Sequence, residues 1–460
     1  MFKRFDVYSM NTIEEIRSQF PALQQLVYGK PLVYLDNGAT SQKPQCVIDL
    51  VERMHTGANA NVHRAMHKLS DDATALYEGA RERVRQFINA PARETIIFTS
   101  GTTASINLVA SSFCRKFVGE GDVVLVSGDS HHSNIVPWQL ACQACGAEVK
   151  AIPVLEDGRL DMEAYRGMLS GRVKIVAVEH ISNVLGIVNP VGEIIALAHA
   201  QGIPVLVDGA QGIVHAKVDV QEMDCDFYAF SGHKIYAATG SGVLYGRQEL
   251  LEAMPPYMGG GDMVDTVTFE RTTYAPLPLK FEAGTPNFIA QASLAPALEF
   301  AARLREGEIA GVVEEQERAI IEYLKGALTG IEGCRIYGLP EGAAGVAGVA
   351  SGASGAALGA PGAVLGVSGA ALGAPGAALG EPGSKIPLFS FNIEGCFPSD
   401  LAQLLDKMGV AVRTGLMCCE PLMTRFGVTS MVRASFLPYN TLQEAEYFVA
   451  SLQRAVRMLR

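Results

Sequence analysis

The sequence has 460 residues, which is too long for one ordinary hydrophobic core and predicts a large domain plus a smaller one. Hydrophobic residues make up 48% and charged residues 18%, as in a globular protein, and the formal net charge of -11 excludes a general basic surface for nucleic acid. A small-molecule substrate or a basic protein partner fits this charge better.

The N-terminus, MFKRFDVYSMNTIEEI, has two early cations but no apolar core and no small-residue cleavage site. We therefore expect no secretory signal and a cytoplasmic location. Nine cysteines at irregular spacing indicate reduced thiols rather than a disulfide framework. Cys142 and Cys145 form a CxxC pair inside an apolar helical stretch, with no second pair and no paired histidines. Packing explains them better than a redox site, and we expect no metal.

The chain divides by pattern into an N-terminal segment, a large domain and a smaller domain. We expect residues 1–30 to form a helix that packs on the smaller domain. From about residue 95 to 246, short apolar runs such as DVVLVS and VKIVAV alternate with helical patterns. This alternation predicts a large α/β domain, residues 31–290, in which a mostly parallel sheet lies between helices.

Residues 291–460 mix helix-like and strand-like patterns and predict a smaller α+β domain. A low-complexity Ala/Gly insertion at 341–384 interrupts it, and residues 342–380 carry no charge and contain a tandem repeat. Its glycines and prolines argue against a membrane span, because such a backbone would leave polar groups unsatisfied in lipid. We interpret it as a flexible surface insertion and expect no membrane contact.

Polar side chains follow the predicted strands directly, at the edge where parallel sheets bind their ligands. The clearest case is SGHK at 231–234, since Lys234 follows an apolar strand and can form a Schiff base with an aldehyde cofactor. Ser231 and His233 would then lie beside a phosphate. Taken alone, a lysine after a strand is usually a solvated surface residue, so this interpretation depends on its neighbours.

Three further clusters complement the lysine. Asp208 ends the strand VLVD, and a buried carboxylate pairs well with a pyridinium nitrogen, although an Asp here can also cap a helix. Thr102 and Thr103 open a helix after a glycine, where N–H groups and hydroxyls bind anions. The ring of His131 can lie flat on an aromatic cofactor and relay protons, whereas we expect His132 to be structural.

Together these clusters resemble the SufS-type cysteine desulfurases, which are fold-type I pyridoxal-phosphate (PLP) enzymes of the class-V aminotransferase family, related to selenocysteine lyase. The resemblance covers almost the whole chain except the insertion. Its motifs are YLDNGATSQKP (34–44), NVHRAMHKLS (61–70), SGTTASINLVA (100–110), HHSNIVPWQ (131–139), SNVLGIVNP (182–190), VLVDGAQ (205–211), DFYAFSGHK (226–234), FEAGTPN (281–287), VRTG (412–415) and VRASFLPYNT (432–441). It implies the α/β fold of the fold-type I PLP-dependent transferases.

The resemblance implies a role for each matching residue. Lys234 forms the Schiff base with pyridoxal 5'-phosphate, Asp208 pairs with the ring nitrogen, and His131 stacks on the ring. Gln211 contacts the phenolic oxygen of the cofactor. The substrate carboxylate falls to Arg433, because a guanidinium fork matches a carboxylate. The remaining implied residues are Thr102, Thr103, Ser231 and His233 for the phosphate, Thr285 for the phosphate from the second subunit of a homodimer, and Asn183 beside the substrate.

The sulfur-accepting cysteine of the family aligns with Cys418 in RTGLMCCEPLM at 413–423. The family usually has two histidines before it, whereas Leu416 and Met417 stand there in this sequence. Cys419 is a second thiol, which could resolve the persulfide, protect it or do nothing. We group Arg413 with the substrate-binding residues, as the candidate for positive charge near the nucleophile.

The implied activity converts L-cysteine to L-alanine, holds the sulfur as a persulfide on Cys418, and passes it to an acceptor for iron–sulfur cluster assembly. Selenocysteine lyase activity in the same pocket is the alternative enzyme, and a scaffold that has lost its chemistry is the alternative of a different class. We expect a SufE-like acceptor rather than a SufU-like one, because Ser399 stands where SufU-dependent relatives place a histidine.

Overall fold

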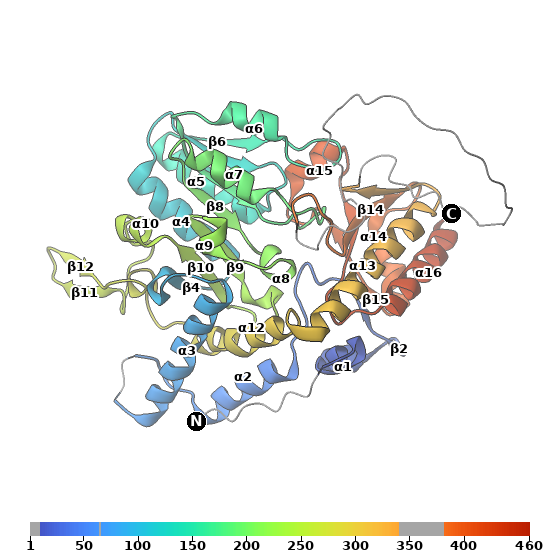
Figure 1. Cartoon of the computed structure of the whole chain (residues 1–460), viewed down its shortest axis with the longest axis horizontal. Coiled ribbons are helices and arrows are strands. Elements are labelled where there is room, and N and C mark those ends of the chain that lie inside the picture. The colour runs from blue at the N-terminus through green and yellow to red at the C-terminus, as the bar shows by residue number, and fades with distance from the viewer. Residues whose placement is uncertain (1–9, 64–65, 340–380) are drawn as a thin grey trace, which may run out of the picture.

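The structure is a computed structural model that describes residues 10–63, 66–339 and 381–460. Figure 1 shows two sheets, each covered by helices, with helix α13 (Gly307–Thr329) leading from the first part to the second. Of the predicted insertion at 341–384, only the last four residues fall within the described ranges. All nine cysteines lie within these ranges, and each is a free thiol.

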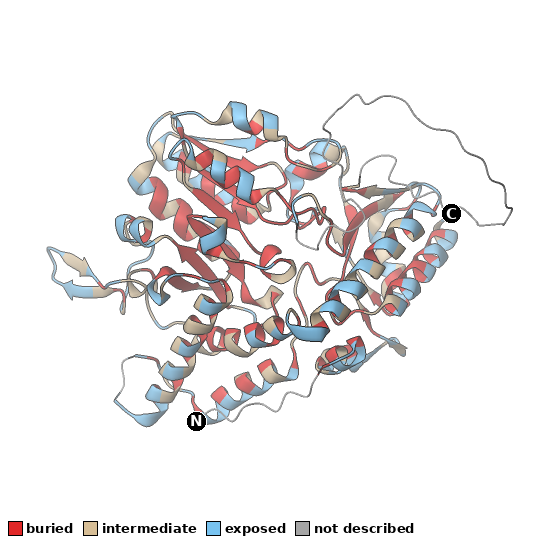
Figure 2. Ribbon diagram, in the orientation of Figure 1, coloured by how far each residue is buried: buried red, intermediate tan, exposed pale blue. Residues whose placement is uncertain are grey.

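The larger sheet has seven strands in the order β4, β10, β9, β8, β7, β5, β6. Within it, β10 runs antiparallel to both of its neighbours, and the pairs from β9 to β6 are parallel. The central strands are buried along their whole length (Figure 2), because they are apolar on both faces and helices cover both. The bounds are β4 Ile96–Thr99, β5 Val123–Ser127, β6 Glu148–Ile152, β7 Val173–Glu179, β8 Val205–Asp208, β9 Phe227–Ser231 and β10 Gly242–Gly246.

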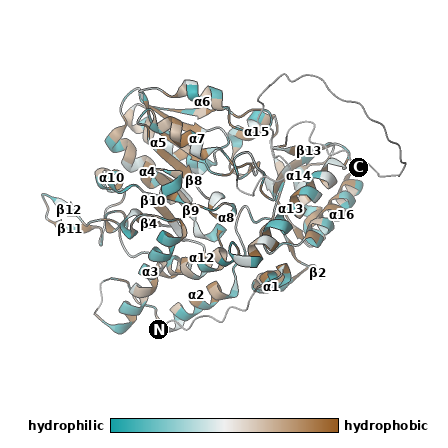
Figure 3. Cartoon of the chain, viewed as in Figure 1, coloured by the Kyte–Doolittle hydropathy of each residue, from teal (hydrophilic) through white to brown (hydrophobic). Residues whose placement is uncertain are grey.

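Helices cover both faces of this sheet (Figure 1). Their inner sides are hydrophobic and their outer sides are hydrophilic, as Figure 3 shows, so burying the inner sides on the sheet stabilises the layers. The helices are α2 Gln45–Gly57, α3 Lys68–Phe87, α4 Thr102–Phe117, α5 Val136–Cys145, α6 Met162–Met168, α7 Val191–His199, α8 Gly212–His215, α9 Val220–Met223, α10 Gln248–Ala253, α11 Phe288–Ala292 and α12 Leu294–Arg303.

The smaller sheet is antiparallel, in the order β13, β14, β17, β16. Its core is a separate apolar cluster that includes Phe389, Phe391 and Phe448. The elements are β13 Cys334–Tyr337, β14 Leu388–Ile393, β15 Val410–Ala411, β16 Arg413–Gly415 and β17 Met431–Ser435, with α14 Pro398–Lys407, α15 Glu420–Phe426 and α16 Leu442–Leu459. This arrangement confirms the predicted α/β class with a large, mostly parallel sheet and a smaller α+β part.

The N-terminal helix is shorter than predicted. Helix α1 spans only Ile13–Ser18, and the chain then forms a short hairpin of β1 (Leu26–Val27) and β2 (Lys30–Pro31). A proline at residue 21 follows the helix and begins a single 3-10 turn, which ends the α-helical path. Arg17 forms an ion pair of 2.9 Å with Glu444, so α1 lies against α16.

The division at residues 30 and 290 remains a prediction. Short strand β3 (Val33–Tyr34) pairs with β15, and helices α11 and α12 pack against α3. Helix α13 packs instead against α16 and β13. These contacts favour a boundary at the turn between α12 and α13. None of the helices in the described ranges is long and apolar enough to cross a bilayer.

Strands β4, β5, β7, β8 and β9 all run in one direction, so their carboxyl ends meet at the same edge of the larger sheet. The polar clusters singled out in the sequence follow these ends directly. This edge faces the smaller sheet through Arg433 on β17, whose Nη1 donates a 2.8 Å hydrogen bond to the carbonyl of Asn183.

Candidate active site

A cavity of about 270 Å³ opens at the carboxyl edge of the larger sheet. Its walls come from loops after five strands of that sheet, from the segment after β3 and from two segments of the smaller part of the chain. The lining residues are Gly38, Ala39, Thr102, Thr103, His131, Ser133, Glu179, Asn183, Asp208, Ala210, Gln211, Ser231, His233, Lys234, Arg413, Met417, Cys418 and Arg433.

One end of the cavity combines the start of a helix with two neighbouring hydroxyl groups. Thr102 is the first residue of α4, and its backbone N–H donates to Ser231 Oγ at 2.8 Å. The two hydroxyl oxygens of this pair are also 2.8 Å apart. Gly101 has φ 152°, and a Cβ there would lie 3.2 Å from Ser231 Oγ, so the close approach of the two segments favours glycine. The start of a long helix carries partial positive charge, which attracts negative charge.

Two buried carboxylates lie on the cavity floor. Asp208 Oδ1 accepts a 2.9 Å hydrogen bond from the N–H of Ala210, and Glu179 Oε1 accepts one of 2.9 Å from the N–H of His131. Burial raises the pKa of Asp208, and burial together with the nearby Asp208 and Asp129 raises the pKa of Glu179. A buried carboxylate is stable only with a cationic or hydrogen-bonding partner, so this floor is suited to a protonated ring nitrogen.

Lys234 and His131 are bases whose basicity the site reduces. Burial lowers the pKa of the Lys234 amine, although Asp208 opposes this effect. Burial and the neighbouring Lys234 lower the pKa of His131 to about 3, so its imidazole is neutral. His131 Nδ1 lies 2.7 Å from Ser133 Oγ, which fixes the ring orientation. A neutral amine is a nucleophile, which is the form that a Schiff base requires.

Arg433 supplies a buried positive charge on the opposite wall. Its Nη1 is bonded to the Asn183 carbonyl, and its Nη2 lies 3.4 Å from Asp36 Oδ1, while its Nε is buried without a partner. Gly38 packs on the guanidinium, since a Cβ there would lie 3.0 Å from it. Arg413 is half exposed and 3.9 Å from Asp36 Oδ2. Unsatisfied donors of this kind match a carboxylate.

The loop that carries the two neighbouring thiols lines part of the cavity. Cys418 is exposed, whereas Cys419 is fully buried with its Sγ 3.3 Å from the Asp129 carbonyl and 3.2 Å from that of Ser130. Burial raises the pKa of the Cys419 thiol. Asn183 Nδ2 donates a 2.9 Å hydrogen bond to the carbonyl of Met417. The accessible thiol at the cavity is therefore that of Cys418.

Comparison with known proteins places the chain in a family. It matches the Aminotransferase class-V family over residues 33–360 and 374–448. A probable cysteine desulfurase of Vibrio cholerae is 43% identical over 450 residues, which are 98% of this chain and 100% of that protein. The crystal structure of the cysteine desulfurase CsdA of Escherichia coli, in an S-sulfonic acid form, is 36% identical with a TM-score of 0.81, covering 98% of this chain and 100% of that one.

The apo structure of a cysteine desulfurase from Thermococcus onnurineus NA1 is 31% identical with a TM-score of 0.82 and covers 98% of this chain and 99% of that one. The chain belongs to the cysteine desulfurases of the class-V aminotransferase family. This confirms the family and the fold-type I architecture expected from the motifs. The cofactor of this cysteine desulfurase is pyridoxal 5'-phosphate.

The residues of the cavity fit this cofactor. Lys234 supplies a buried amine, Asp208 a buried carboxylate, and the start of α4 with Ser231 an anion site. Gln211 and His233 also line the cavity; Gln211 Nε2 donates to the Gly38 carbonyl at 2.9 Å, and burial lowers the pKa of His233 to about 4. An aldehyde, a ring nitrogen and a phosphate would each find its chemical complement here.

The structure brings together every predicted site residue except Thr285, which is exposed and does not line this cavity. Besides the small residues Gly38, Ala39 and Ala210, three lining residues were not predicted: Ser133, Glu179 and Met417. Glu179 ends the buried strand VKIVAVE, and a charged residue at the carboxyl end of an apolar run was a signal that could have identified it. Their roles, like those of the predicted residues, are matters for proposal.

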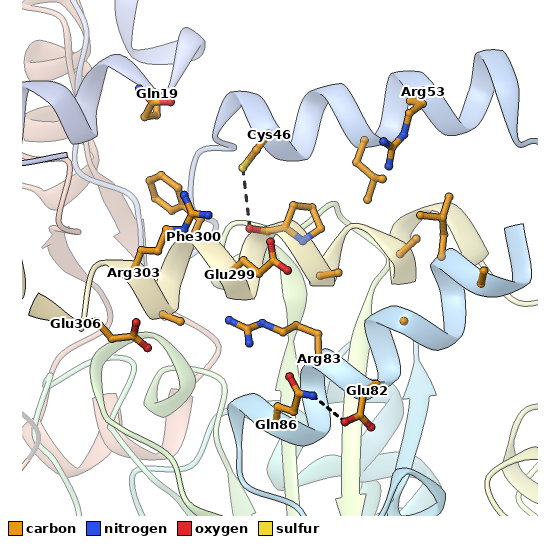
Figure 4. A pocket seen from close by; sticks show the side chains of 18 residues that line it. Gln19, Cys46, Arg53, Glu82, Arg83, Gln86, Glu299, Phe300, Arg303 and Glu306 are labelled. Carbon is orange, nitrogen blue, oxygen red and sulfur yellow. Dashed lines mark hydrogen bonds between the residues drawn. The ribbon is translucent and has the colours of Figure 1, made fainter. Parts of the chain in front are cut away.

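A second, larger cavity of about 650 Å³ lies between α2, α3 and α12 (Figure 4). It contains none of the predicted site residues. The one thiol that lines it, Cys46, is half-buried, with its Sγ 4.0 Å from the Pro296 carbonyl, and burial raises its pKa to about 11. Size alone therefore does not identify the reacting site in this molecule, and the smaller cavity holds the chemistry.

Proposed function

We propose that the protein converts L-cysteine to L-alanine and holds the removed sulfur as a persulfide on Cys418. The position of Cys418 carries this proposal: the thiol is exposed and lines the same cavity as Lys234 and Arg433. A thiol that takes sulfur from a bound substrate and gives it to an acceptor must reach both the cavity and the solvent.

In this proposal Arg433 binds the substrate carboxylate, and Asn183 lies beside the substrate. The Nε of Arg433 is a buried donor without a partner, whereas the unpaired Oδ1 of Asn183 is an acceptor and would need a donor group of the substrate. Leaving such groups unpaired is costly, and a carboxylate would satisfy the guanidinium in a defined orientation. The amino acid would then be oriented with its thiol toward the loop of Cys418, which lines the cavity.

Lys234 and His131 move protons. The cofactor, when bound, supplies an electron sink that stabilises negative charge at Cα of the substrate. Burial lowers the pKa of both side chains and so favours their neutral forms, and only a neutral amine or imidazole has a lone pair that can take up a proton. We assign removal of the α-proton to Lys234 and proton relay on the ring face to His131. Asp208 would hold the ring nitrogen of the cofactor in its protonated form.

In this proposal Cys418 is the nucleophile that takes the sulfur. Its Sγ, as the thiolate, attacks the sulfur of the substrate, an S–S bond forms, and the substrate C–S bond breaks with its electron pair remaining on the three-carbon fragment. That fragment takes up protons and leaves as alanine. The outer sulfur of the persulfide is then open to attack by a thiol of the acceptor, which returns Cys418 to the thiolate.

We further propose a SufS-type homodimer in the cytoplasm that delivers sulfur to a SufE-like acceptor for iron–sulfur cluster assembly. Thr285 lies outside the cavity of its own chain, which supports its assignment to the cofactor phosphate of a second subunit. Ser399 is exposed at the start of α14, in the place where SufU-dependent relatives have a histidine, which supports a SufE-like rather than a SufU-like acceptor.

The test is alanine release from L-cysteine with a thiol reductant present. We expect the wild type and Cys419→Ser to turn over and Cys418→Ala to lose turnover, while the visible absorption of the cofactor is the same in all three. If Cys418→Ala still released alanine from cysteine, the persulfide assignment would be wrong, and a lyase that acts without a cysteine nucleophile, such as selenocysteine lyase, would replace it.

A further inference from the structure

The turn at 129–132 contacts the loop of Cys418 at the reactive residue and at the two residues that follow it. The backbone N–H of His132 donates a 2.7 Å hydrogen bond to the carbonyl of Cys418. The imidazole Nε2 of the same histidine accepts a 3.2 Å hydrogen bond from the N–H of Glu420. His132 thus contacts the residue itself and the residue two positions after it, without lining the cavity.

Cys419 adds further contacts between the turn and the loop. Its thiol is fully buried and donates to the carbonyls of Asp129 and Ser130, the two residues before the histidine pair. Burial also raises the pKa of this thiol, which keeps it protonated and able to donate. A buried thiol used in this way holds the loop in place and cannot receive sulfur from a partner.

The backbone of the loop has an unfavourable conformation that these contacts stabilise. Met417 has φ 51° and Cys418 has φ 54°, so two successive residues with a Cβ adopt the left-handed region. This conformation is unfavourable for L-residues unless neighbouring contacts hold it. The carbonyl of the first is held by Asn183 Nδ2, and the carbonyl of the second by the N–H of His132.

We propose that His132 is a positioning residue that, with Cys419, fixes the Cys418 thiol at the mouth of the cavity. The proposal rests on the proposed function, since it concerns the residue assigned there as the sulfur acceptor. The two adjacent histidines therefore serve different steps. His131 lines the cavity, where protons move, and His132 holds the loop of Cys418, which takes the sulfur. Accepting from Glu420 requires the neutral imidazole with its proton on Nδ1.

Two variants of His132 separate positioning from bulk structure. His132→Phe keeps a ring but loses the acceptor, whereas His132→Gln keeps an oxygen that can accept from the N–H of Glu420. We expect His132→Phe to lower kcat for alanine release by about 10²-fold, as a misplacement of about 1 Å does elsewhere. KM should change by less than about twofold, since Arg433 is untouched, and His132→Gln should recover most of the loss.

A second readout is independent of turnover. In the holoenzyme without cysteine, we expect the rate of Cys418 alkylation by iodoacetamide and the amide hydrogen exchange of residues 416–420 to rise in His132→Phe and in Cys419→Ala, but not in His132→Gln or Cys419→Ser. If exchange and alkylation stayed at the wild-type rate in both His132→Phe and Cys419→Ala, the positioning role of His132 and Cys419 would be refuted. If both rates rose while the wild type formed no persulfide, the positioning role would stand and the proposed function would fail.

Discussion

Arg433 is a buried guanidinium whose hydrogen-bonding capacity is only partly used. The Asn183 carbonyl and Asp36 occupy its two terminal nitrogens, its Nε has no partner, and burial lowers its pKa. Gly38 packs closely against the guanidinium, and this contact holds the guanidinium in one orientation. A planar fork held in this way can select a carboxylate by geometry, which a single ammonium group cannot do.

We therefore predict that Arg433→Lys raises KM for L-cysteine by at least about tenfold, because a charge-assisted hydrogen bond contributes about 1.5–3 kcal/mol. The visible absorption of the cofactor should not change. Arg318→Lys, on an exposed part of α13, is the matched control and should keep the wild-type KM. Steady-state alanine release measures both variants, and an unchanged KM in Arg433→Lys would remove Arg433 from substrate binding.

At the scale of elements, the segment that begins at residue 381 is hydrogen-bonded to the loop that contains Asn183. Ile386 N–H donates to the Gly186 carbonyl at 2.9 Å, and Val188 N–H donates to the Ser384 carbonyl at 3.0 Å. Lys385 lies between them, buried, with its Nζ bonded to the carbonyls of Leu185 and Leu388. Burial lowers its pKa to about 7.

This lysine should make stability depend on pH. Between about pH 7 and its ordinary pKa of 10.5, the unfolded chain holds a proton that the folded chain has released. The free energy of unfolding therefore rises with pH across that window, by up to about 1.4 kcal/mol per pH unit. Lys385→Met should lose this contribution to the slope in urea unfolding, and exposed Lys150→Met should keep it. Parallel curves for Lys385→Met and the wild type would contradict the prediction.

The strands that the sequence revealed are those buried on both faces, since an uninterrupted apolar run is visible without any partner. The strand β6 was missed because Glu148 and Lys150 point to solvent at the edge of the sheet, where it pairs only with β5. Its polar pattern resembles that of a loop. The length of α1 was misjudged for a related reason: the segment after Ser18 has apolar residues, but its pairing in a hairpin depends on contacts that no local pattern encodes.

At the scale of the whole molecule, the sequence could predict that the residues after β4, β5, β7, β8 and β9 share the cavity, because these five strands run in one direction. Arg413, Cys418 and Arg433 lie in the smaller part of the chain and were expected there only from the family resemblance. The sequence could not show that Cys419 is buried or that His132 holds the neighbouring loop. Those contacts join segments nearly 290 residues apart and depend on how the smaller part docks on the larger sheet. Thr285 marks the remaining limit, since its predicted partner is on another subunit.

The last prediction concerns the surface through which the proposed dimer forms. The hairpin of β11 (Val264–Val267) and β12 (Thr272–Tyr274) projects from the body of the molecule (Figure 1). Its side chains of Val267, Phe269 and Tyr274 are 61%, 107% and 48% exposed. Apolar groups on a projecting arm are costly in water, and a second copy of the chain would bury them.

Replacing all three with serine should weaken self-association at least about tenfold, a loss of about 1.4 kcal/mol. The matched control is Phe397→Ser, which removes a 75% exposed ring far from the hairpin and should leave the mass in solution unchanged. Light scattering across a dilution series measures the mass, and dialysis followed by absorption measures cofactor retention. If Thr285 of a second subunit holds the phosphate, the triple variant should lose cofactor as it becomes monomeric; a monomeric variant that retains its cofactor fully would remove Thr285 from the site.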